Sequence, residues 1–145
     1  MRKHICLLAV LSPVLSVHLL MSCTPSPQGT DPISVTKAFF AAINQGKAEA
    51  AANCFAKDGE FIAYGQKYSG QKLRDFFTKS LISLGTQIET QELSVDGVRI
   101  DGTIRVTNSW LKPQFPKGIP PFSVASIVQD GKIRSMSWEV IRKGR

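Results

Sequence analysis

Histidine is nearly missing from this 145-residue chain, which has only His4 and His18, both close to the N-terminus. A domain that begins after these two positions has no imidazole. That absence excludes Ser-His-Asp and Cys-His nucleophilic catalysis, histidine general bases and histidine-containing metal sites. The sequence therefore predicts no bound metal and no cofactor, and leaves carboxylates, tyrosines and lysines as the groups for any acid-base chemistry.

A long uninterrupted apolar run is missing too. Residues 5–20 are mostly apolar, but Pro13 and His18 interrupt them, and a bilayer-spanning helix needs about 20 clean apolar residues. A positively charged start precedes this segment, which is the pattern of a secretory signal. We therefore predict a removable signal peptide over residues 1–22.

Cys23 ends the run Leu20-Met21-Ser22-Cys23, directly after this segment. The run resembles the bacterial lipobox, in which the cysteine receives lipid and becomes the new N-terminus. The resemblance implies a lipoprotein held by acylated Cys23 at a membrane of the cell envelope, because each buried CH₂ of its acyl chains adds about 0.8 kcal/mol. The alternative is an ordinary signal peptide with an incidental cysteine.

Cysteine is sparse in the remaining chain, and its net positive charge is modest. Cys54 is the single cysteine after Cys23, so no intrachain disulfide can form, and its apolar neighbours predict a buried, unreactive thiol. Loss of the signal lowers the formal net charge from +7 to +5, because two basic residues leave with it. The other basic residues are scattered rather than aligned with stacking aromatics, so we expect no nucleic-acid partner.

The first half of the mature chain has helical patterning. Residues 23–30 are rich in proline and polar residues, which predicts a flexible tether before one domain at residues 31–145. Asp31 as N-cap and Pro32 at the first helical position open a helix. The elements expected after it are a helix at 48–55, a strand at 60–64, a turn at 65–70 and a helix at 73–84.

The second half alternates apolar and polar residues, as β-strands do. Asp130-Gly131 is the clearest hairpin signal. Asp96-Gly97 and Asp101-Gly102 compete for the preceding turn, and we favour the second pair, with the first as a bulge. Residues 112–121 hold several prolines and predict a long connection, since proline cannot donate to a central strand ladder.

This order of elements predicts an α+β fold, with helices gathered on one face of an antiparallel sheet. Five sequence features carry a further signal: residues 35–46, 54–61, 68–77 and 130–133, and Trp138. With them, residues 33–141 resemble the nuclear transport factor 2-like superfamily, which includes SnoaL-like polyketide cyclases and ketosteroid isomerases. The resemblance implies a cone-shaped fold with three N-terminal helices packed on a curved, mostly antiparallel mixed sheet. It identifies no reaction.

Acid-base candidates are few. Glu60 and Tyr64 fall on the same face of the expected first strand, which would set a carboxylate and a phenol beside a pocket. Asp101 is a second carboxylate that could act with Tyr64. The alternative, without a functional role, is that Glu60 is a surface residue and Tyr64 a core or rim aromatic. A ketosteroid-isomerase-like site is disfavoured because the first helix has phenylalanines where related isomerases have a tyrosine.

Two tryptophans and one asparagine complete the candidate ligand-binding set. Trp138 shares a strand face with Met136 and Val140, which predicts a buried aromatic that is structural before it is functional. Trp110 adjoins the proline-rich connection and is expected at a pocket mouth. Asn108 is a candidate for fixing the orientation of a ligand.

Three hypotheses follow for the function. The first is an envelope lipoprotein whose domain binds a small apolar ligand or an envelope protein through Glu60, Tyr64, Asn108, Trp110 and Trp138. The second is an isomerase or cyclase that uses Glu60 or Asp101 with Tyr64. The third is an accessory structural lipoprotein with a collapsed pocket. Non-enzymatic binding is favoured, and a homodimer remains open.

Overall fold

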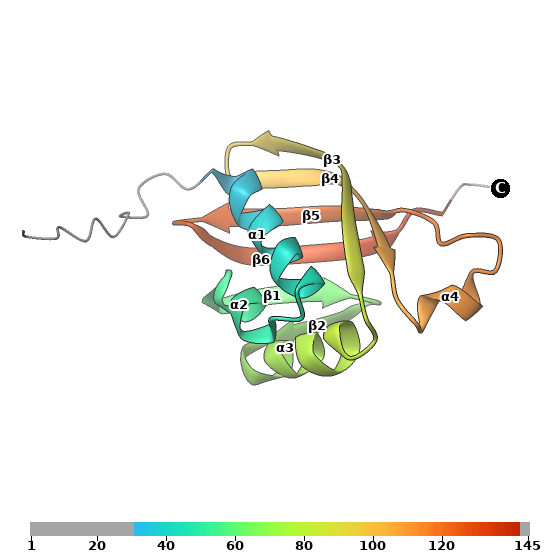
Figure 1. The fold of residues 1–145 in the computed structure, drawn as a ribbon. Helices are drawn as coiled ribbons and strands as arrows, with labels where there is room; N and C mark the ends of the chain where they lie inside the picture. The colour runs from blue at the N-terminus through green and yellow to red at the C-terminus, as the bar shows by residue number, and fades with distance from the viewer. Residues whose placement is uncertain (1–30, 143–145) are drawn as a thin grey trace, which may run out of the picture.

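The computed structural model describes residues 31–142 of the chain (Figure 1). The expected signal peptide, lipidated Cys23 and the tether at 23–30 therefore lie outside the described residues. Within residues 31–142, no helix has the length and apolar character needed to cross a bilayer.

Three helical segments cover one face of the sheet (Figure 1). They are α1 (Pro32–Asn44), α2 (Ala48–Asn53) and α3 (Gly70–Phe76), the last continued by a π-helical segment, η1 (Phe77–Ile82). The predicted start of α1 is confirmed, because the Asp31 carboxylate accepts a hydrogen bond from the Ser34 amide at 3.2 Å and Pro32 follows it.

Six strands form one mixed sheet in the order β2-β1-β6-β5-β4-β3. Only β1 and β6 run parallel; the other neighbouring strands are antiparallel. The predicted α+β fold, with helices packed on a mostly antiparallel mixed sheet, is confirmed. The strand bounds are β1 (Phe55–Ala63), β2 (Gln66–Ser69), β3 (Gln87–Asp96), β4 (Arg99–Thr107), β5 (Phe122–Gln129) and β6 (Lys132–Val140).

The second helix and first strand differ from the sequence prediction. The helix ends at Asn53 rather than at residue 55, because Phe55 already pairs with Ile133 of β6 and packs edge-on against Phe39. Gly59 lies inside β1. A Cβ at Gly59 would lie 2.8 Å from the Ile133 carbonyl oxygen, so glycine permits a close approach where the register shifts.

The segment at 65–70 was predicted as a turn, and most of it is strand β2. A two-residue turn at Tyr64 and Gly65 joins β1 to β2, with φ of 53° and 74°. This left-handed pair is the turn that suits a tight hairpin. Tyrosine is unusual there, which is why the sequence pattern did not indicate a hairpin.

The turn before the last hairpin is at Asp96-Gly97, so the preference for Asp101-Gly102 was wrong. Gly97 has φ of 60° between β3 and β4, whereas Gly102 lies within β4, opposite Leu93. A Cβ at Gly102 would lie 2.2 Å from the Glu92 carbonyl oxygen. This glycine is needed where the β3–β4 register shifts. The predicted hairpin at Asp130-Gly131 and the long connection before β5 are confirmed.

Aromatic side chains fill the space between the helices and the sheet. Phe39 of α1 is fully buried, and its ring centroid lies 5.2–6.2 Å from those of four rings on other elements. These rings belong to Phe55, Phe61, Phe77 and Trp138. All belong to one hydrophobic cluster within residues 31–142, which joins the helices to the sheet.

The two glycines of the β3–β4 hairpin give a direct test of this register. We expect Gly102→Ala to destabilise the protein by about 2 to 3 kcal/mol, because its Cβ would overlap the Glu92 backbone. As the control, Gly97→Asn should change stability by less than about 1 kcal/mol, because asparagine tolerates a positive φ. Urea unfolding measures both. The reverse order would contradict the observed turn.

Candidate functional site

The connection between β4 and β5 forms one end of the molecule, beyond the end of the sheet (Figure 1). It contains a short helix, α4 (Leu111–Gln114). Leu111 is buried, and Phe115 and Ile119 pack against the core, so this connection is attached to the domain. A hydrogen bond from the Ile141 amide to the Pro121 carbonyl at 2.9 Å ties its far end to the end of β6.

Asn108 holds the start of α4 in place. Its Oδ1 accepts hydrogen bonds from the amides of Trp110 at 3.1 Å and Leu111 at 2.8 Å, and its Nδ2 donates to Thr86 Oγ1 at 3.2 Å. The side chain is only 3% exposed. Asn108 therefore fixes the backbone conformation at Trp110 and Leu111.

Trp110 and Tyr64 form an exposed aromatic pair. Their ring centroids are 5.6 Å apart at an interplanar angle of 78°, an edge-to-face contact between residues far apart in sequence. Both rings remain about half exposed. Partial burial, and to a lesser degree the neighbouring Tyr68, raise the pKa of the Tyr64 phenol above its ordinary value. The phenol is therefore a hydrogen-bond donor at neutral pH.

Two hollows adjoin the end of β6, and Tyr64 of this pair lines the smaller one. The smaller, of about 360 Å³, is lined by Tyr64, Trp138 and Glu139 with their neighbours. The larger, of about 740 Å³, lies between the proline-rich connection and the strand end. Both hollows share Val140 and Arg142. The lining of the larger one is Phe115, Gly118, Pro120, Pro121, Val140, Ile141 and Arg142.

Trp138 contributes to both the core and the smaller hollow. It is 5% exposed and packs against Phe39, Phe40 and Phe61, so the prediction of a buried sheet-face tryptophan is confirmed. Its indole Nε1 has no hydrogen-bond partner among residues 31–142. Trp138 is also one of the residues that line the hollow beside Tyr64.

Glu60 lies on the other face of the sheet. In β1, Phe61 and Ala63 point toward the helices, and Glu60 and Ile62 point away from them. Glu60 forms an ion pair with Lys67 of β2 at 2.9 Å. The strand ends at Ala63, so Tyr64 lies in the turn rather than on the Glu60 face. The expected pairing of this carboxylate with the phenol beside one pocket does not occur.

Asp101 lies far from both groups. It is three strands away from Ile62, through Ser137 and Ala125, which is roughly 14 Å at the usual strand spacing. The Arg99 guanidinium contacts its carboxylate at 2.5 and 2.8 Å, and this hydrogen bonding holds the pKa of Asp101 below its ordinary value. A carboxylate held ionised in this way is a weak general base.

Two further features bear on possible chemistry elsewhere in the described residues. Cys54, predicted to be buried, is half-buried at the end of α2, and burial raises the pKa of its thiol despite the opposing charge of Lys132. A raised pKa leaves little thiolate at neutral pH. Within residues 31–142, no group of three or more potential metal ligands is close enough to hold an ion.

Sequence reasoning missed the residues that line the larger hollow. Ile141 and Arg142 follow the last strand, where no pattern distinguishes them from an ordinary terminus. The signal available was the proline-rich character of residues 112–121, which predicted a long connection but not the segment that faces it across the hollow. The structure brings together Tyr64, Trp110 and Trp138, and leaves Glu60 and Asp101 elsewhere.

Comparisons with known proteins identify the fold. No known protein family and no curated protein match the sequence. A putative polyketide cyclase from Sinorhizobium meliloti matches the structure with a TM-score of 0.64 at 17% identity, over 76% of this chain and 100% of that one. A putative ketosteroid isomerase from Kribbella flavida gives 0.59 at 15% identity, over 79% and 82%.

A third structural neighbour carries the fold name itself. This nuclear transport factor 2-like protein of unknown function from Cytophaga hutchinsonii has a TM-score of 0.61 at 11% identity, over 78% of this chain and 92% of that one. At such low identity, the likenesses establish a nuclear transport factor 2-like fold and no activity. The fold predicted from the sequence is therefore confirmed.

The role of Asn108 can be tested through stability. Asn108→Ala removes the acceptor of two amides and the partner of Thr86, so we expect a loss of about 2 to 3 kcal/mol in unfolding free energy. Asn108→Asp keeps the acceptor oxygen and should lose about 1 kcal/mol. Thermal or urea unfolding measures both. An alanine variant as stable as the parent would contradict this capping role.

Proposed function

We propose that this protein is a lipid-anchored envelope lipoprotein whose domain binds a small apolar molecule at the α4 end of the sheet. The proposal is carried by two adjoining hollows at the end of β6, the smaller of which is lined by Tyr64 of the half-exposed Tyr64–Trp110 pair. Aromatic and apolar linings with a few polar groups are typical of small-molecule sites. Exposed clusters of this kind mark contact surfaces.

The position of the polar groups favours binding over catalysis. General acid-base catalysis needs a group within hydrogen-bond reach of the reacting atom and with a pKa near the working pH. Glu60 is on the opposite sheet face from Trp138, and Asp101 is engaged by Arg99. The interior position that a pocket would occupy is filled by aromatic rings such as Phe39 and Phe61.

The start of the described domain bears on how the proposed anchor would orient it. The domain begins at Asp31, and α1 starts near the end of the sheet opposite to α4 (Figure 1). A tether from Cys23 joins the domain at that end. The two hollows would then face away from the anchored end, where they can meet a ligand from the surrounding solution.

Lipidation at Cys23 is tested by mass. Intact-mass analysis of protein extracted from membranes should show loss of residues 1–22 and a lipid adduct on Cys23, because acylation precedes cleavage at a lipobox. Cys23→Ala should remain uncleaved at this position. A mature form with an unmodified cysteine would contradict the anchor.

Ligand binding is tested with N-phenyl-1-naphthylamine, an uncharged apolar dye, and the chain from residue 24 onward. We expect its fluorescence to rise on binding, and Trp110→Ala to weaken binding roughly five- to tenfold, since a lost aromatic contact is worth about 1 kcal/mol. Val98→Ala is the matched control, because Val98 is about as exposed but lies at the β3–β4 turn. Equal binding by the parent and Trp110→Ala would contradict the assigned site.

A further inference from the structure

The larger hollow has a simple chemical lining. Six of its seven lining residues are apolar, proline or glycine: Phe115, Gly118, Pro120, Pro121, Val140 and Ile141. The seventh, Arg142, carries the only charged side chain among them. A surface of this kind matches a molecule that is apolar along most of its length and negatively charged at one point.

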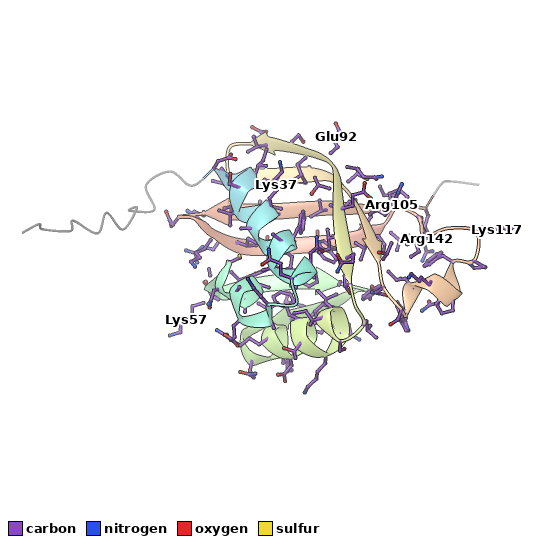
Figure 2. All side chains as sticks on the ribbon, in the orientation of Figure 1. Lys37, Lys57, Glu92, Arg105, Lys117 and Arg142 are labelled. Carbon is purple, nitrogen blue, oxygen red and sulfur yellow. The ribbon has the colours of Figure 1, made fainter. Side chains whose placement is uncertain are left out.

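Arg142 differs from the other arginines of the described chain in having no acidic partner there. The remaining four form ion pairs: Arg74 with Glu49, Arg99 with Asp101, Arg105 with Glu89 and Arg134 with Asp58. No carboxylate of residues 31–142 lies within ion-pair distance of Arg142. Figure 2 shows Arg142 and Lys117 at the end that carries α4.

We infer that the larger hollow binds a single-chain alkyl carboxylate, with the carboxylate on Arg142 and the alkyl chain along the proline-rich connection. This inference rests on the proposed function, because it assigns the ligand class of the same site. The guanidinium presents paired N–H donors that fit a carboxylate bidentately. The exposed side chain of Ile141 and the ring of Phe115 offer apolar surface beside it.

The single charge favours a carboxylate over a phosphate monoester. A monoester carries between one and two negative charges at neutral pH, about −1.5 to −2. Among the described residues that line the larger hollow, Arg142 is the one cation, so it balances one negative charge. Glu139, which lines the adjoining smaller hollow, would repel a second charge near Arg142.

The test uses the chain from residue 24 onward and displacement of the same uncharged dye. Octanoate, nonanoate and decanoate should displace it with affinities that rise about fourfold per methylene. Decanoate should bind roughly tenfold more tightly than 1-decanol at low salt, and this preference should shrink at high salt. Decyl phosphate should bind no more tightly than decanoate.

Substitutions separate the charge from the apolar surface. Arg142→Gln should bind decanoate and 1-decanol equally, while Arg142→Lys should keep part of the preference for the acid. Arg105→Gln is the matched control, because Arg105 is an exposed arginine on β4 with an acidic partner, and it should behave as the parent.

Three results would contradict the inference, and each overturns a different part of it. Equal binding of acid and alcohol by the parent overturns the carboxylate assignment and leaves apolar binding intact. A preference for the acid that survives Arg142→Gln overturns the role of this residue. Failure of the dye itself to bind overturns the proposed function, and the inference with it.

Discussion

The packing of Phe39 against the rings of other elements is the contact on which the rest of the structure depends. It joins α1 to β1 through Phe55 and Phe61, to η1 through Phe77 and to β6 through Trp138. A buried aromatic of this size typically contributes about 3 to 5 kcal/mol, as judged from its truncation. The same rings fill the space between the helices and the sheet, and the two hollows described above lie at the end of the sheet instead.

The fold alone does not assign an activity to this chain. Its structural neighbours include a putative cyclase and a putative ketosteroid isomerase, yet fold does not imply function. Here Glu60 faces away from the helices, and Asp101 is paired with Arg99. The polar groups that remain near Tyr64 and Trp110 are suited to orienting a bound molecule, and Arg142 is the charged group best placed for it.

Sequence patterns predicted the elements whose signals are local. The Asp31-Pro32 helix start, the Asp130-Gly131 hairpin and the buried face of Trp138 were all predicted correctly. Tertiary contacts decided the others. Phe55 follows an alanine-rich helix but pairs with β6. Gly102 follows an aspartate, as a turn glycine often does, but it lies within a strand where two backbones approach closely. The hollow beside Arg142 depends on two segments that meet only in the folded chain, so no local pattern predicts it.

Amide chemical-shift mapping locates the bound ligand, either at the α4 end, as proposed, or between the helices and the sheet. With ¹⁵N-labelled chain from residue 24 onward and added decanoate, we expect the largest shifts at Phe115, Ile141 and Arg142. Largest shifts at Phe39 and Phe61, with little change at Arg142, would contradict the proposal and place the ligand in the interior.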